Sequence, residues 1–247
     1  MSRRRFYVQP TDISGSLISL SKEETHHLVH VLRLMPGDEV FVFDGCGNEY
    51  RCIVRAESGS RAKLEVVWPL SDVVESPVWL TLAQSLAKSD KFDLIVQKAT
   101  ELGVSRIIPL TTEHADVRVS RDQGNRRLDR WRRISLEALK QCGRRRLVEI
   151  TQPITVKTLL EAEDRGSLLV FSEKGGTSIA AALRRAGTRH DLTILIGPEG
   201  GWSHAELALL NDRGVTAVSL GPRILRTETA ALVAITLVQH SLGDLSN

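Results

Sequence analysis

The sequence predicts an α/β protein in two parts, a small β-rich part followed by a larger part in which strands and helices alternate. Three observations support this prediction. Short β-favouring runs separated by turn formers fill residues 1–72, a polar segment framed by prolines lies at 69–77, and strand-like and helix-like runs alternate from residue 77 onward. Of the 247 residues, 42% are hydrophobic, which is enough to bury a core. We therefore expect one domain over residues 1–72 and a second over 77–247.

The first part is predicted to be a small closed or partly closed β-barrel. Its β-favouring runs are 5–8, 38–43, 49–56 and 63–68, with turn formers such as Pro36-Gly37 between them. One helix interrupts the strands. It begins after Ser21, and an apolar side that includes Leu28 and Val31 would face the barrel.

The second part is predicted to be a largely parallel sheet covered by helices. Strands are expected at 78–83, 106–110, 147–151, 168–171, 192–196 and 215–220, and helices near 89–102, 126–142, 155–163, 178–186, 203–212 and 228–242. Ligands of such sheets sit beyond the carboxyl ends of the strands. The loops that follow the strands are therefore where we expect the functional site.

Composition excludes several classes of protein. Three cysteines are too few for a disulfide scaffold, and the charged residues 3–5 precede no apolar stretch of the kind found in secretory signals. No apolar run reaches the roughly 18 residues that a membrane span needs. Zinc-ligand spacing, a P-loop and a G-x-S-x-G motif are not found in the sequence. We expect a cytoplasmic protein with no metal and no membrane contact.

Charge is concentrated in one segment. Ten basic and three acidic residues between Arg121 and Arg146 give it a charge of +7, whereas the whole chain carries +3 and the remainder −4. On a helix, Arg126, Arg130, Arg133 and Arg144 share one stripe, opposite an apolar side that includes Trp131. A solvated helix face is the ordinary explanation of such a run. Stacked arginines nevertheless favour a nucleic-acid backbone as the partner.

Glycine-containing loops follow three of the predicted strands, at 171–176, 197–203 and 221–230, and the first two are glycine-rich. Glycine allows the main chain to approach a ligand closely, so together the loops predict a ligand site lined by backbone groups. Ser203 and Glu206 have the spacing of a capping box, and Thr227 is a candidate N-cap for the last helix. Glu199 would either anchor its turn or face a cationic ligand. The last helix, 229–240, is apolar on nearly every side, which predicts an oligomer.

The loops Leu195-Ile196-Gly197-Pro198-Glu199-Gly200-Gly201-Trp202-Ser203 and Leu220-Gly221-Pro222-Arg223-Ile224-Leu225-Arg226-Thr227-Glu228-Thr229-Ala230 resemble the paired C-terminal motifs of SPOUT-class RNA methyltransferases. The closer resemblance is to the RsmE family, which methylates N3 of a uridine in small-subunit (16S) ribosomal RNA. Arg5-Phe6-Tyr7-Val8, His26-His27-Leu28 and the segment 84–103 agree with the same family. The resemblance implies a PUA-like barrel, a trefoil-knotted α/β domain that binds S-adenosylmethionine, and a homodimer formed through the C-terminal apolar helix.

The resemblance also implies which residues bind the methyl donor. They are Phe171, Ser172, Glu173, Ile196, Gly197, Pro198, Glu199, Gly200, Gly201, Leu220, Gly221, Pro222, Ile224, Leu225, Arg226, Thr227, Thr229 and Ala230. For holding 16S RNA, free or in the assembled small subunit, we expect Arg5, Lys91, Arg126, Arg130, Arg133 and Arg144.

Catalysis would require the removal of the uridine N3 proton and stabilisation of the resulting anion. We assign anion stabilisation to Arg226, which could instead clamp a phosphate or carboxylate. The general base is left open between Glu199, Glu228 and water. Two other functions are kept as alternatives: an RNA-binding ribosome assembly factor without catalysis, and a ribose 2′-O-methyltransferase acting on another RNA.

Overall fold

The computed structural model describes residues 4–58, 61–71, 74–115, 117, 121–187 and 191–246. The chain forms two compact units, one made of Met1–Glu75 with Leu136–Leu147 and the other of Ser76–Ser135 with Val148–Asn247. The division after Glu75 falls in the polar segment 69–77. The sequence analysis placed 136–147 in the second domain instead, because residues up to 142 continue the apolar periodicity of the helix expected near 126–142.

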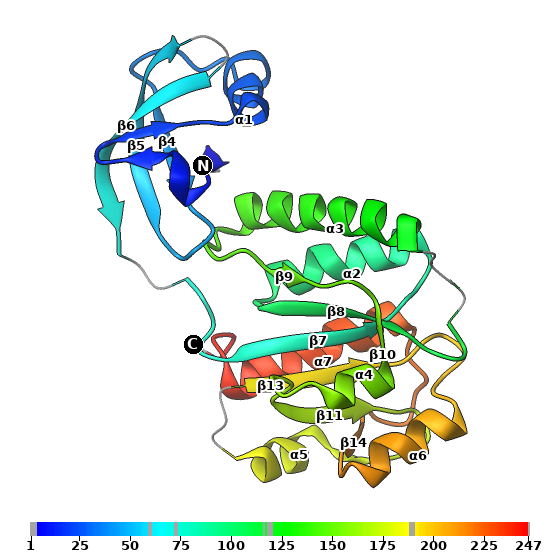
Figure 1. Cartoon of the computed structure of the whole chain (residues 1–247). Helices are drawn as coiled ribbons and strands as arrows, with labels where there is room; N and C mark the ends of the chain where they lie inside the picture. The colour runs from blue at the N-terminus through cyan, green and yellow to red at the C-terminus, as the bar shows by residue number, and fades with distance from the viewer. Residues whose placement is uncertain are drawn as a thin grey trace. The chain divides into compact units, whose positions relative to one another are not determined.

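The first unit contains a six-stranded sheet with the order β1-β4-β5-β6-β3-β2. The strands are β1 (Arg5–Tyr7), β2 (Ile13–Ser14), β3 (Leu17–Ser19), β4 (Glu39–Phe43), β5 (Glu49–Ser58) and β6 (Arg61–Leu70). β1 and β4 are parallel, and the other pairs are antiparallel. Figure 1 shows these strands curving around a shared interior. The core contains Phe6, Ile18, Val40 and Leu64.

Two features of the first unit extend the sequence prediction. β2 and β3, of two and three residues, were not predicted because such short strands carry no measurable periodicity. The expected helix is α1 (Lys22–His26), which continues into a π-helical turn, His27–Val31. The Ser21 hydroxyl accepts a hydrogen bond from the Glu24 amide at 3.1 Å and caps α1.

The second unit contains an eight-stranded sheet with the order β10-β8-β7-β13-β11-β14-β12, in which β9 pairs with β8. The strands are β7 (Trp79–Ser85), β8 (Arg106–Thr111), β9 (Glu149–Ile150), β10 (Ile154–Thr155), β11 (Ser167–Phe171), β12 (Thr177–Ser178), β13 (Asp191–Ile196) and β14 (Thr216–Ser219). The neighbouring pairs described are all parallel. This confirms the predicted parallel sheet, whose central strands are apolar runs because both faces are covered.

Helices cover both faces of this sheet, as Figure 1 shows with α7 behind the strands and α4 in front of them. The helices are α2 (Ser89–Glu101), α3 (Arg121–Cys142), α4 (Val156–Glu161), α5 (Ile179–Ala186), α6 (His204–Asp212) and α7 (Thr227–Leu242). Residues that alternate along β13 join different cores: Ile194 and Ile196 pack in the cluster that contains α2 and α7 residues, and Leu195 packs with α4 and α6 residues. Because β11 pairs in parallel with both β13 and β14, the carboxyl ends of these three strands meet at one edge of the sheet.

Candidate functional site

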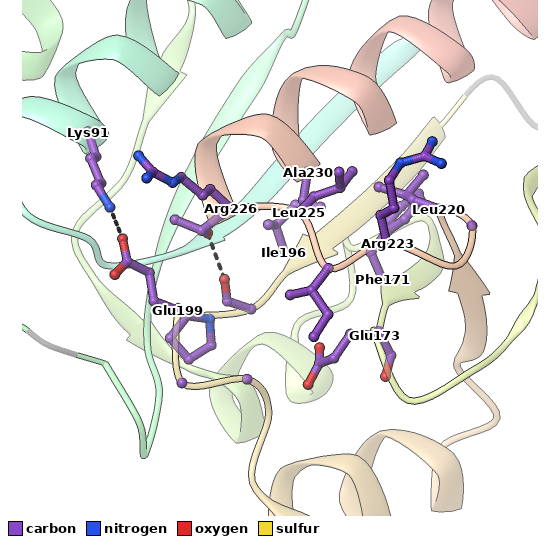
Figure 2. A pocket seen from close by; sticks show the side chains of 18 residues that line it. Lys91, Phe171, Glu173, Ile196, Glu199, Leu220, Arg223, Leu225, Arg226 and Ala230 are labelled. Atoms are coloured by element: carbon purple, nitrogen blue, oxygen red, sulfur yellow. Dashed lines mark hydrogen bonds and ion pairs between the residues drawn. The ribbon is translucent and has the colours of Figure 1, made fainter.

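A pocket of about 530 Å³ lies at the carboxyl ends of β11, β13 and β14 in the second unit. Phe171 is in register with Ile196 on β13 and with Val218 on β14, so the loops after these strands start side by side. Figure 2 shows the side chains that line the pocket. They are Lys91, Phe171, Ser172, Glu173, Ile196, Gly197, Pro198, Glu199, Gly200, Gly201, Leu220, Gly221, Arg223, Ile224, Leu225, Arg226, Thr227 and Ala230.

The pocket contains nearly all the residues expected to bind a methyl donor. Among those expected residues, only Pro222 and Thr229 do not line it, and both are exposed. Two lining residues were not in that set. Lys91 was expected to hold RNA, and Arg223 was given no role although it belongs to the quoted motif. The structure thus brings together three loops that are separated by 20 to 50 residues in the sequence.

The turn after β13 is fixed by contacts that explain its glycines. The Trp202 indole, 2% exposed, donates to the Phe171 carbonyl at 2.9 Å. A Cβ atom at Gly197 would lie 3.0 Å from that indole, so a side chain there would displace the ring. Gly201 has φ of +71°, and its amide donates to the Pro198 carbonyl at 3.0 Å. This conformation is costly for any residue with a Cβ atom.

The predicted capping box is confirmed at the start of α6. The Ser203 hydroxyl accepts from the Glu206 amide at 3.2 Å, and the Glu206 carboxylate accepts from the Ser203 amide at 3.0 Å. Glu206 also accepts from the Glu113 amide at 3.1 Å, and the ring nitrogen Nδ1 of His114 lies 3.1 Å from the Gly201 carbonyl oxygen. The loop after β8 therefore supports the outer side of the glycine turn.

The prediction that Thr227 caps the last helix is wrong. Arg226, with extended backbone, occupies the N-cap position, and Thr227 is the first residue of α7. The Thr227 hydroxyl donates to the Gly197 carbonyl at 2.7 Å and accepts from Nε2 of Gln84 at 3.0 Å. The Thr227 hydroxyl, which the local sequence pattern assigned to helix capping, is therefore used in tertiary hydrogen bonds instead.

Charged side chains gather at one side of the pocket, where Figure 2 shows Lys91, Glu199 and Arg226. Lys91, on α2, forms an ion pair with Glu199 in the turn after β13. This hydrogen bond lowers the pKa of Glu199, and the charges of Lys88 and Arg226 act in the same direction. The same bond raises the pKa of Lys91. Both groups are therefore charged at neutral pH, and Glu199 is a weaker base than an ordinary glutamate.

Other groups considered for the chemistry lie at or near this side. The side chain of Arg226 is exposed and lines the pocket. Glu228, in the first turn of α7, is half-buried and does not line the pocket. Its Oε2 atom is buried without a hydrogen-bond partner among the described residues. Of the two candidate carboxylates, only Glu199 faces the cavity.

Three of the arginines expected to hold RNA are exposed along α3, namely Arg126, Arg130 and Arg133. The guanidinium of Arg130 donates to Asp93 at 2.8 Å and still leaves its side chain 59% exposed. The opposite side of the helix is buried, and Trp131 stacks on Phe92 with ring centroids 4.4 Å apart. The predicted division of α3 into a basic and a buried side is present.

Arg5 and Arg144 were also expected to hold RNA, but both side chains are buried within the first unit. Arg5 is 8% exposed, donates to Glu49 at 2.6 Å and reaches the Arg144 carbonyl at 2.9 Å. Arg144 is 6% exposed and binds Glu75 at 2.8 Å, and Arg145 shares Glu49 at 3.0 Å.

The expectation for Arg144 extended the helical spacing beyond Cys142, where α3 ends. Gly143, with φ of +93°, redirects the chain after the helix. No local sequence signal indicated that Glu49 and Glu75 would neutralise these cations.

Within the described ranges, no group of three or more histidine, cysteine, aspartate or glutamate side chains could hold a metal ion. Among the same residues, no helix combines the length and hydropathy required to cross a membrane.

Comparisons with known proteins match both units. Residues 74–239 match a family model described as RNA methyltransferase domain, and residues 20–67 match one described as RNA methyltransferase PUA domain. Ribosomal RNA small subunit methyltransferase E of Synechocystis is 33% identical over 96% of this chain and 78% of its own. The protein of the same name from Bacillus subtilis is 30% identical over 90% of this chain and 89% of its own.

Two solved structures resemble the whole chain. One is a ribosomal RNA small subunit methyltransferase E from Neisseria gonorrhoeae bound to S-adenosylmethionine, with a TM-score of 0.88, 32% identity and coverage of 98% of this chain and 99% of that one. The other is a methyltransferase from Legionella pneumophila in complex with the same cofactor, with a TM-score of 0.90, 30% identity and coverage of 99% and 100%.

Proposed function

The chain belongs to the RNA methyltransferase family that includes the ribosomal RNA small subunit methyltransferases E, and we propose that it uses S-adenosylmethionine to methylate N3 of a uridine in 16S ribosomal RNA. The observation that carries the proposal is the pocket built from the loops after β11, β13 and β14. A protein that only bound RNA would have no need of a cavity lined by main-chain groups.

The pocket suits the methyl donor in size and chemistry. Its volume of about 530 Å³ lies within the roughly 300–1,000 Å³ of small-molecule sites. Ile196, Leu225 and Phe171 offer apolar surface to an adenine ring, and the glycine turn offers amide and carbonyl groups to its edge. The carboxylates of Glu173 and Glu199 would complement a ligand that carries positive charge.

Catalysis would depend on positioning and on stabilisation of charge. When bound, S-adenosylmethionine supplies a methyl group on a sulfonium, and transfer to N3 of uridine releases the N3 proton. Arg226 would stabilise the negative charge that develops on the uracil ring, because its exposed guanidinium lies at the pocket. Since Lys91 lowers the pKa of Glu199, we favour water over Glu199 as the proton acceptor.

RNA would be held in part by the exposed arginines of α3. Arg126, Arg130 and Arg133 repeat at helical spacing on one side, which suits contacts to successive phosphates. Substituting one of them should weaken RNA binding and reduce its dependence on salt. Arg5 and Arg144 are not part of this proposal because their side chains are buried.

We further propose a homodimer formed through α7. Ala231, Ile235 and Val238 of this helix are buried, whereas Leu232 and Leu237 remain partly exposed. Apolar side chains that stay accessible on a largely apolar helix favour a second copy as their cover. The trefoil knot and the cytoplasmic location are likewise proposals, which rest on the family and on its ribosomal substrate.

The proposed activity is tested by incubating the purified protein and S-adenosylmethionine with 16S RNA, either free or in assembled small subunits. Mass spectrometry of the nucleosides identifies the product. We expect a methyl group on uridine N3. A ribose methyl group would favour the 2′-O-methyltransferase alternative, and RNA binding without methylation of either substrate would favour an assembly factor.

A further inference from the structure

Two buried polar side chains connect the centre of the sheet to the pocket. Gln84 lies near the end of β7, in register with Ile196, the last residue of β13. Its Nε2 atom donates to the Thr227 hydroxyl at 3.0 Å, and that hydroxyl donates to the Gly197 carbonyl at 2.7 Å. Gln84 is 0% exposed and Thr227 is 4% exposed. Thr227 and Gly197 line the pocket, whereas Gln84 does not.

The direction of these hydrogen bonds follows from the surrounding groups. Nε2 of Gln84 also donates to the Ser85 carbonyl at 3.0 Å. A flipped amide would place its oxygen against that carbonyl, so the orientation with the nitrogen toward Ser85 is the favourable one. The Thr227 hydroxyl has one proton, and because it accepts from Gln84 that proton is directed to the Gly197 carbonyl.

Stability alone does not account for this arrangement. The Oε1 atom of Gln84 is buried without a partner among the described residues, and an unsatisfied buried acceptor lowers stability. Replacing both hydrogen-bonded side chains by apolar ones of similar shape is often neutral or stabilising. Methionine and valine are close in shape to glutamine and threonine and carry no hydrogen-bonding groups in their place. The polar pair is therefore explained better by what it does to Gly197.

We propose that Gln84 and Thr227 are positioning residues that hold the Gly197 carbonyl, and with it the turn after β13, in the geometry that binds the methyl donor. This inference rests on the proposed function. Recognition by main-chain groups depends on backbone placement to a fraction of an ångström, because backbone groups cannot adjust by changing rotamer. The two hydrogen bonds from Gln84 to Thr227 and from Thr227 to Gly197, which we call the relay, connect that backbone to β7 in the interior of the sheet. The position of the Gly197 carbonyl is thereby restrained.

The test measures donor affinity by calorimetry, and kcat and KM by steady-state kinetics. The variants are Thr227→Val, Thr227→Ser, Gln84→Met and the double variant that combines Gln84→Met with Thr227→Val. We expect Thr227→Val and Gln84→Met each to weaken donor binding about fivefold to tenfold, the equivalent of one net hydrogen bond. The KM for the donor should rise while the KM for RNA stays unchanged. Thr227→Ser keeps the hydroxyl and should bind almost normally.

Two further measurements separate positioning from a structural role. The double variant should bind the donor no more weakly than the weaker-binding of the two single variants, because both substitutions interrupt the same chain of hydrogen bonds. Thr193→Val is the matched control. Thr193 lies on β13, the strand that leads into the Gly197 turn, and does not line the pocket. Its hydroxyl donates to the Arg165 carbonyl at 2.6 Å. This control should lose stability without losing donor affinity.

Specific outcomes overturn the inference. Normal affinity in Thr227→Val, additive losses in the double variant, or an equal loss in Thr193→Val would each refute the relay. Because the double variant leaves no polar half of the pair behind, it provides the test even if a single variant fails to fold. If the unmodified protein itself bound no donor, the proposed function would fail, which is a different result from a relay that has no effect.

Discussion

Replacing Gly201 by alanine tests whether the carboxylate of Glu173 takes part in donor binding. Gly201 has φ of +71°, and a Cβ atom there would lie 2.6 Å from Oε1 of Glu173, closer than a carbon and an oxygen can approach. The Glu173 side chain is flexible and can move aside, so this contact should cost little folding energy. The carboxylate would nevertheless leave its place at the pocket wall.

The two effects of Gly201→Ala have different magnitudes. The left-handed backbone conformation should lower the free energy of unfolding by about 1–2 kcal/mol. For a protein of this size, each kcal/mol lowers Tm by roughly 2–4 °C. A hydrogen bond to a charged group is worth about 1.5–3 kcal/mol, so displacement of Glu173 should weaken donor binding about 10- to 100-fold.

Gly214→Ala is the matched control for this experiment. Gly214 has φ of +68°, and beyond its two chain neighbours no atom of the described residues lies within 4 Å of the position of its Cβ atom. Both variants should therefore lose similar stability in urea unfolding, whereas only Gly201→Ala should lose donor affinity in calorimetry. If the two variants bind the donor equally well, Glu173 has no part in recognition.

Three further predictions concern charged residues. Lys91→Met should raise the pKa of Glu199, because it removes the ammonium group whose hydrogen bond lowers that pKa. The acidic limb of the pH–rate profile should then move to higher pH. An acidic limb that does not move would show that the negative charge of Glu199 is not needed for activity. Arg226→Ala should reduce kcat about 100- to 1,000-fold with little change in donor Kd, and an unchanged kcat in single-turnover assays would remove it from catalysis. Glu49→Gln should lower the unfolding free energy by about 3–5 kcal/mol, since two buried arginines lose their counter-charge. The matched variant Glu39→Gln breaks an exposed pair and should cost less than about 1 kcal/mol; similar losses in both would contradict the assigned burial.

The sequence determined most elements of the second unit because they carry their own local signals, although the two-residue strands β10 and β12 were not predicted. The apolar run 192–196 is a strand, the alternation of basic and apolar residues around Trp131 is a helix, and Ser203 with Glu206 caps α6 as the spacing predicts. The three glycine-containing loops were also recognisable as candidates for a ligand site, because glycine marks places where the main chain turns or is approached closely.

Tertiary structure decided which of these local features meet. Lys91 and Glu199 are 108 residues apart and pair only because α2 and the turn after β13 lie at the same edge of the sheet. Thr227 carries the local signal of a cap, yet its hydroxyl is bound by Gln84 and Gly197. Arg5 resembles a surface cation in the sequence and is buried against Glu49.

The physical reason is the range over which each interaction acts. Helix and strand periodicity depends on neighbours within a few residues, so it can be derived from the chain alone. The order of the strands in the sheet depends on contacts between segments that are distant in sequence. The same contacts decide which side chains of neighbouring elements meet. The identity of the pocket residues could be anticipated from the glycine loops and from their resemblance to known motifs, but the partners that hold those loops in place followed only from the folded chain.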